Sequence, residues 1–145
     1  MQVQDIMTAR PELVNRRATL QETARKMHEL NIGVLPVVDR GHLVGMVTDR
    51  DLAVRGVALG LHPTATWVEA VMTPDVVSCL DTDDVHIAAE LMARCGVRRV
   101  VVVNAKGKPV GILSVDDLAN RASDDRLVAA ALHASHATSP PRHDV

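Results

Sequence analysis

The chain has 145 residues and almost no aromatic side chains: Trp67 stands alone, with no Phe and no Tyr. Proteins that bind nucleic acid usually present a basic face and often stack bases on aromatic rings. This chain instead balances 16 Lys and Arg against 18 Asp and Glu. The composition therefore argues against nucleic acid as the main partner, and it predicts an aliphatic core.

Other absences narrow the class of protein further. No apolar run reaches the length of about eighteen residues that a membrane span needs, and the start Met1–Asp5 lacks the basic and apolar regions of a signal peptide. Cys79 and Cys95 form neither a CxxC pair nor a disulfide framework. We therefore expect a cytoplasmic protein with no membrane association and two reduced thiols.

Residues for catalysis or metal binding are also scarce. The sequence has no Gly-rich phosphate loop and no nucleophile elbow, and neither cysteine has a base beside it to activate a thiol nucleophile. Of the seven histidines only His133 and His136 lie close together. We expect surface histidines, no metal, no catalytic residue and no required cofactor.

What the sequence does contain is an internal repeat. Met7-Thr8 recurs 65 positions later as Met72-Thr73, and Asp51-Leu52-Ala53 recurs 66 positions later as Asp117-Leu118-Ala119. Self-similarity at a fixed period indicates two copies of one structural unit. The predicted ranges are 1–58 for the first repeat, 59–67 for a linker, 68–133 for the second repeat and 134–145 for a disordered tail.

Each copy predicts the order β-α-β-β-α. A short strand precedes an amphipathic helix, which in the first copy begins after Thr19, with Glu22 completing a capping box. Unbroken apolar runs at 34–38 and 100–103 favour strands covered on both faces, and each leads into a hairpin. We predict an α/β (α+β) fold of two tandem repeats, packed sheet-to-sheet about a pseudo-twofold axis.

The same string closes both repeats at a strand-to-helix junction. It reads Gly45-Met46-Val47-Thr48-Asp49-Arg50-Asp51 in the first and Gly111-Ile112-Leu113-Ser114-Val115-Asp116-Asp117 in the second. Ser/Thr-x-x-Asp can serve as a helix cap with no ligand at all. The alternative is a binding site, because a hydroxyl and a carboxylate can hold a ribose diol while the helix N-terminus favours a phosphate.

This duplicated unit resembles the cystathionine-β-synthase (CBS) domain pair, or Bateman module, over about Val3 to Ser123. The resemblance implies an adenosyl ligand (AMP, ADP, ATP or S-adenosylmethionine) that regulates an effector protein, and a homodimer through helices. It implies that Thr48 and Asp51 hold one ribose and Ser114 and Asp117 the other. The base would lie against Ile32, Gly33 and Val34 with Met46 closing the other side, and Ile112 would belong to the second, weaker site.

The two sites are not expected to be equal. In nucleotide-binding relatives, basic residues at the start of the opposite repeat's hairpin strand reach the phosphate, and Arg98 and Arg99 would serve the Asp51 site in this way. The corresponding Gly33 and Val34 carry no charge, so the Asp117 site is expected to be empty or to take a neutral adenosine moiety. Alternatively, Arg98 and Arg99 form a solvated strand edge or a dimer salt bridge.

Three functions remain open at this level. The first is an adenine-nucleotide sensor that modulates a partner, and the second is a ligand-free homodimeric scaffold associated with stress response. The third is an enzyme, which the missing catalytic motifs disfavour.

Overall fold

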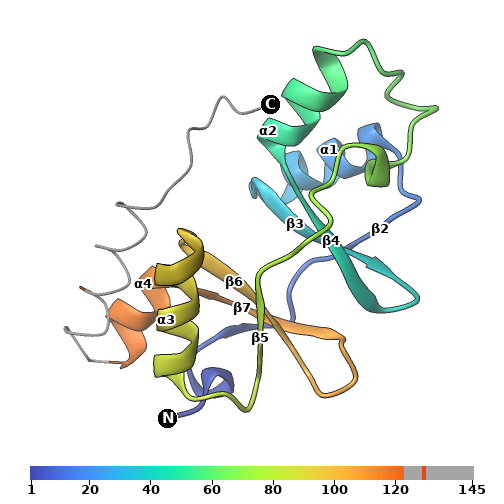
Figure 1. Ribbon diagram of the computed structural model, residues 1–145. Coiled ribbons are helices and arrows are strands. Elements are labelled where there is room, and N and C mark those ends of the chain that lie inside the picture. Colours follow the sequence, from blue (N-terminus) through green and yellow to red (C-terminus); the bar gives the residue numbers. More distant parts are fainter. Residues whose placement is uncertain (123–128, 130–145) are drawn as a thin grey trace. The chain divides into compact units, whose positions relative to one another are not determined.

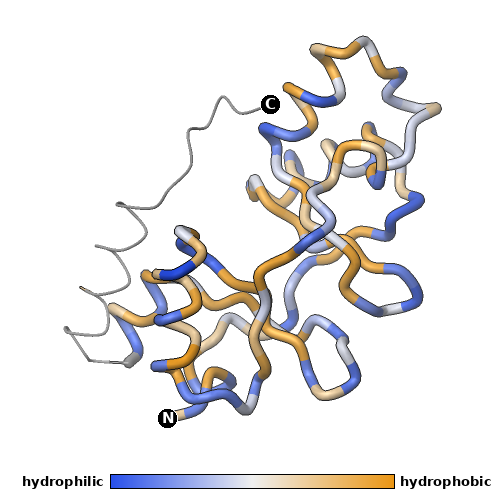
Figure 2. The backbone as a smooth tube through the Cα atoms, in the orientation of Figure 1, coloured by the Kyte–Doolittle hydropathy of each residue, from blue (hydrophilic) through white to orange (hydrophobic). Residues whose placement is uncertain are grey.

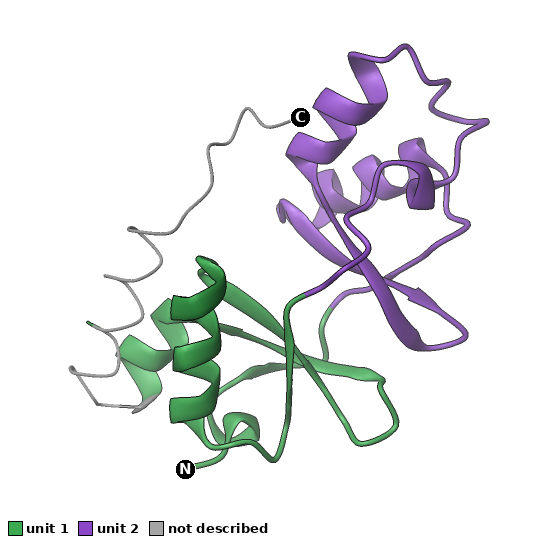
Figure 3. Cartoon of the chain, in the orientation of Figure 1, with its two compact units in different colours: residues 1–11, 77–144 green, residues 12–76, 145 purple. Residues whose placement is uncertain are grey.

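The computed structural model describes residues 1–122 and residue 129. The predicted tail at 134–145, together with His133 and His136, lies outside this part of the chain. The described residues form two compact units (Figure 3): unit 1 joins Met1–Pro11 to the chain from Val77 onward, and unit 2 runs from Glu12 to Val76.

Unit 2 is built on a three-stranded sheet in the order β2-β3-β4 (Figure 1), where β2 pairs parallel to β3 and β3 pairs antiparallel to β4. Its strands are β2 (Val14–Asn15), β3 (Val34–Asp39) and β4 (His42–Thr48), and its helical elements are α1 (Leu20–Leu30), α2 (Asp49–Asp51), the π-helix η2 (Leu52–Val57) and the 3-10 turn η3 (Val68–Ala70).

Unit 1 repeats this plan with one additional strand. Its sheet has the order β1-β7-β6-β5, with β5 parallel to β6 and the other pairs antiparallel. The elements are η1 (Val3–Asp5), β1 (Thr8–Ala9), β5 (Ser78–Leu80), α3 (Val85–Cys95), β6 (Arg99–Val103), β7 (Pro109–Ser114), α4 (Val115–Asp117) and η4 (Leu118–Ala122).

The α/β class and the order β-α-β-β-α in each copy are confirmed. The spatial units nevertheless differ from the sequence repeats at one end, because β1 lies at the start of the first repeat and pairs with β7 of the second. The repeat boundaries and the face-to-face packing of the sheets stay predictions.

Each unit has its own aliphatic core between one face of its sheet and its helices. In unit 2 the core includes Leu35, Val37 and Val47, all fully buried, and in unit 1 it includes Val100, Val102 and Leu113. Figure 2 shows the hydrophobic colouring concentrated along the strands. Because side chains alternate across a strand, the residues between these core positions point to the other face of each sheet.

Helix α1 begins where the sequence predicts it. The Thr19 hydroxyl accepts a hydrogen bond from the Glu22 backbone N–H at 3.1 Å, and Asn31 ends the helix in a left-handed conformation. The predicted capping box is only half formed, because no hydrogen bond from the Thr19 backbone to the Glu22 carboxylate accompanies the first one. No helix among residues 1–122 is long and apolar enough to cross a membrane.

Candidate functional site

In unit 2 the hairpin register brings the predicted ligand-binding residues to one end of the sheet. Val34, at the start of β3, is the partner of Thr48 at the end of β4. Met46 precedes Thr48 by two residues and therefore shares its face of the sheet, while Val47 points into the core. This face carries half-buried side chains next to the beginning of α2.

Thr48 and Asp51 form a complete capping box. The Thr48 backbone N–H donates to Asp51 Oδ2 at 2.9 Å, and the Asp51 backbone N–H donates to Thr48 Oγ1 at 3.0 Å. The side-chain positions are thereby fixed, with the Asp51 carboxylate 14% exposed. The box leaves Asp51 Oδ1 as an acceptor and the Thr48 hydroxyl proton as a donor, so capping and ligand binding are compatible.

Gly33 lies directly beside this helix start. Its carbonyl accepts the Asp49 backbone N–H at 2.9 Å, which ties β3 to α2. A methyl group on Gly33 would lie 3.0 Å from Asp49 Oδ2, so the glycine leaves room for that carboxylate. Ile32 precedes it as a half-buried residue that packs against the unit 2 core.

Met46 is held by a segment that is distant in the sequence. Its backbone exchanges two hydrogen bonds with Thr73, at 2.9 and 2.8 Å, which adds a one-residue bridge to the edge of β4. The repeat explains the arrangement, because Thr8, the counterpart of Thr73, pairs with Ile112 of β7 in unit 1. Both candidate sites therefore border a short antiparallel pairing that includes the threonine of the Met-Thr dipeptide.

Unit 1 reproduces the site residue by residue. Ser114 and Asp117 form the equivalent complete capping box, with distances of 2.9 and 3.1 Å. The Val115 backbone N–H donates to the Arg98 carbonyl at 3.0 Å, as Asp49 does to Gly33 in unit 2. Ile112 precedes Ser114 by two residues and shares its face of the sheet.

Arg98 and Arg99 are exposed and line a small cavity of about 40 Å³ together with Ser114, Val115 and Asp116. In unit 1 they therefore stand where Gly33 and Val34 stand in unit 2. The prediction that they also serve the Asp51 site stays a prediction.

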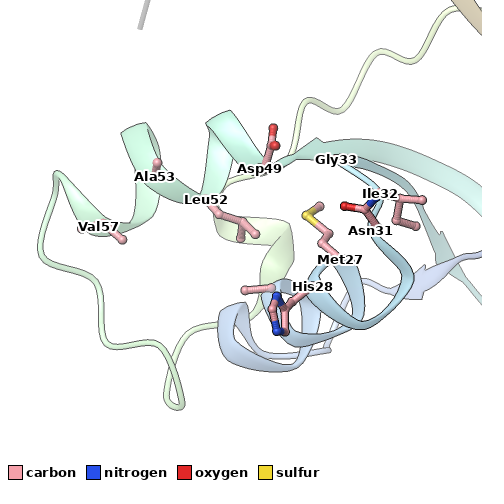
Figure 4. Close-up of a pocket in the computed structure, with 10 residues that line it drawn as sticks. Met27, His28, Asn31, Ile32, Gly33, Asp49, Leu52, Ala53 and Val57 are labelled. Carbon is pink, nitrogen blue, oxygen red and sulfur yellow. The ribbon is translucent and has the colours of Figure 1, made fainter.

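A larger pocket of about 530 Å³ opens between α1 and the helix formed by α2 and η2 (Figure 4). Met27 and Leu52 face this space, whereas the Asp49 carboxylate points away from it. Neither Thr48 nor Asp51 lines it, so it is distinct from the predicted ribose site. The lining residues are Ala24, Met27, His28, Asn31, Ile32, Gly33, Asp49, Leu52, Ala53 and Val57.

The sequence analysis did not identify Arg55 as a neighbour of Asp51. Its Nε lies 4.0 Å from Asp51 Oδ1, one helical turn along the same face. An acidic and a basic residue four positions apart on a helix predict such a contact, so the sequence could have indicated it. Nothing local in the sequence, by contrast, indicates that Thr73 borders Met46.

Comparison with known proteins agrees with the duplicated architecture. The family model of the CBS domain matches the chain twice, at residues 3–56 and 68–124. The CBS domain-containing protein YhcV of Bacillus subtilis (strain 168) is 38% identical over 135 residues, covering 92% of this chain and 95% of its own.

Two solved structures show a similar fold with bound ligands. A CBS domain protein of Pyrobaculum aerophilum complexed with AMP matches with a TM-score of 0.72 at 29% identity, covering 92% of this chain and 99% of its own. The CBS domain pair of protein MJ0100, in complex with 5'-methylthioadenosine and S-adenosyl-L-methionine, matches with a TM-score of 0.70 at 27% identity. The match covers 85% of this chain and 96% of that structure's chain.

Proposed function

The chain belongs to the CBS domain family, and we propose that it is a regulatory CBS pair that binds an adenosyl ligand and thereby modulates a partner protein. The candidate ligands are AMP, ADP, ATP and S-adenosylmethionine. The observation that carries the proposal is the repeated pairing of a hydroxyl with a half-buried carboxylate at Thr48–Asp51 and Ser114–Asp117.

The proposed contacts use the atoms that the capping box leaves available. Asp51 Oδ1 accepts from a ribose hydroxyl, and the Thr48 hydroxyl donates to the neighbouring one, in keeping with the role of an acid at the ribose in dinucleotide sites. The base then lies against Ile32, Gly33 and Val34, with Met46 on the same sheet face as Thr48. The ligand is regulatory, and the module is a binding protein rather than a catalyst.

Regulation follows if the ligand distinguishes two conformations of the protein. A ligand shifts such an equilibrium only by its differential affinity for the two states, and a hundredfold preference amounts to about 2.7 kcal/mol. The proposed sensor acts in the cytoplasm on a separate effector protein, as a homodimer through its helices. The exposed Val57, at the rim of the pocket between α1 and η2, supports that dimer surface.

The second candidate is a ligand-free homodimeric scaffold. One observation favours it: both capping boxes are complete within the chain, so the Ser/Thr and Asp residues stabilise the helix starts even without a ligand. The two functions differ in whether the carboxylates are needed for an interaction with a small molecule.

Isothermal titration calorimetry of AMP, ADP, ATP and S-adenosylmethionine separates them. We expect binding of at least one ligand, abolished by Asp51→Ala and retained in the matched variant Asp117→Ala. Each substitution also removes the carboxylate half of a capping box. Thermal unfolding therefore has to show a similar loss of stability for both variants. Absence of heat for all four ligands at about millimolar concentration, where a Kd corresponds to about 4 kcal/mol, contradicts the sensor and favours the scaffold.

A further inference from the structure

Each unit carries an arginine four residues after the acid of its capping box, but the two arginines make different contacts. Arg55 Nε lies 4.0 Å from Asp51 Oδ1. Arg121 Nη1 donates instead to the carbonyls of Ile6 and Met7, at 3.1 Å each, and forms no ion pair with Asp117 in the described part of the chain. Within residues 1–122, the equivalent arginines therefore differ: Arg55 faces the acid of its capping box, and Arg121 does not.

The contact completes the surroundings of the Asp51 carboxylate. Oδ2 is occupied by the Thr48 backbone N–H, and Oδ1, the oxygen left for a ligand, faces the guanidinium. An oxygen has more than one lone pair, so Oδ1 can face Arg55 and still accept from a ligand hydroxyl. The guanidinium therefore restricts the rotation of the carboxylate without blocking it.

Arg55 also anchors the segment that borders the site. Its Nη1 donates to the Val71 carbonyl at 3.4 Å, two residues before Thr73, which pairs with Met46. Val71 is fully buried, so this end of the contact is fixed by the core. The guanidinium thus contacts both the Val71 carbonyl and the Asp51 carboxylate. It links the position of the carboxylate to the segment that borders Met46.

We propose that Arg55 is a positioning residue that orients Asp51 Oδ1 toward the ribose diol of the ligand, an inference that rests on the proposed function. Arg55 acts through the carboxylate and not on the base or the phosphate. Its removal weakens only those ligands that use the diol. The expected loss is about two- to fivefold, since the pair is partly exposed and longer than a close ion pair.

The test compares AMP with 2',3'-dideoxy-AMP by calorimetry in the wild-type protein and in Arg55→Ala, Arg55→Lys, Arg121→Ala and Asp51→Ala. We expect Arg55→Ala to weaken AMP binding about two- to fivefold and to leave binding of the dideoxy compound unchanged. Asp51→Ala is expected to weaken AMP binding more strongly. Arg55→Lys is expected to restore part of the AMP affinity. Arg121→Ala is the matched control and retains the wild-type preference for the diol.

The outcomes separate this inference from the proposed function. Equal weakening of both compounds by Arg55→Ala indicates a general structural or phosphate role and overturns the inference. In a second outcome, Arg55→Ala keeps the wild-type preference for AMP over the dideoxy compound, and Asp51→Ala loses it. That result overturns the inference about Arg55 and leaves the proposed function standing. A wild-type protein that binds no adenosyl ligand overturns the proposed function, and the inference falls with it.

Discussion

Replacing Gly45 with alanine is expected to destabilise unit 2 by an amount that can be worked out from its neighbours. A methyl group at this position would lie 2.5 Å from Met72 Sδ, 3.1 Å from Met72 Cγ and 3.0 Å from the Thr73 carbonyl oxygen. The thioether can rotate, but the carbonyl oxygen is held by the Met46 backbone N–H at 2.9 Å. The bridge beside the candidate site therefore has to stretch.

Three contributions set the size of the effect. Overpacking in a filled site costs about 1–3 kcal/mol, and weakening the hydrogen bond between Met46 and Thr73 adds about 0.5–1.5 kcal/mol. Gly45 does not have a positive φ, so alanine can adopt its backbone conformation. By lowering the entropy of the unfolded chain, the substitution stabilises the folded protein by about 0.4–1 kcal/mol, which offsets part of the loss. The net expectation is a free energy of unfolding lower by about 2 kcal/mol.

Urea unfolding followed by the fluorescence of Trp67 measures this quantity directly, because the only tryptophan lies in unit 2. The control is Gly33→Ala, whose methyl group would meet the end of the exposed Asp49 side chain. The Asp49 Oδ1 accepts the Arg50 backbone N–H at 2.8 Å, but the side chain is exposed and water can replace that bond. We therefore expect a shift below about 0.5 kcal/mol there. A Gly45→Ala protein as stable as the Gly33→Ala control would refute the reasoning.

Two further predictions concern a thiol and the helix surface. Burial raises the pKa of the Cys79 thiol to about 11, with smaller contributions from Asp83 and Asp81, so at pH 8 only about one part in a thousand is the reactive thiolate. Iodoacetamide should then modify the exposed Cys95 alone in the folded protein and both thiols in urea, and equal rates in the folded protein would contradict this. Val57→Asp places a charge on a side chain that is 78% exposed, and light scattering should show a dimer converted to a monomer; a wild-type monomer would count against the dimer.

The sequence predicted the parts of the fold that rest on local patterns. The apolar run at 34–38 became β3, and the Thr19 cap started α1 where expected. Both Ser/Thr-x-x-Asp strings formed capping boxes because their hydrogen bonds join residues only three apart. Glu22 did not complete its box, and the spacing alone does not distinguish it from the Asp residues that did.

Nonlocal pairings lay beyond the same patterns. Thr8–Ala9 is too short to show a strand period, and its partner Ile112 lies over a hundred residues away, so its pairing in unit 1 had no local signal. The sequence predicts one final helix from about Thr48, whereas the structure divides it into α2 and the π-helix η2 (Leu52–Val57). The spacing of four residues predicts the contact between Arg55 and Asp51. Arg121 has the same spacing from Asp117 but bonds backbone carbonyls instead, and only the structure distinguishes the two cases.

The two repeats keep the hydroxyl and the acid of the capping box but differ in charge at the positions around and between them. Gly33 of unit 2 is matched by Arg98 of unit 1, and Arg50 by Asp116, whereas the hydroxyl and acid of each box are kept. A helix cap needs only the hydroxyl and the acid, so a pure scaffold places no demand on the charge of the neighbouring positions. Two sites for different ligands do require different charges at these positions. A guanidinium attracts a phosphate, whereas a glycine leaves uncharged space for a base. This asymmetry favours one phosphorylated ligand per chain over two equal sites, and a calorimetric stoichiometry of two identical sites would contradict it.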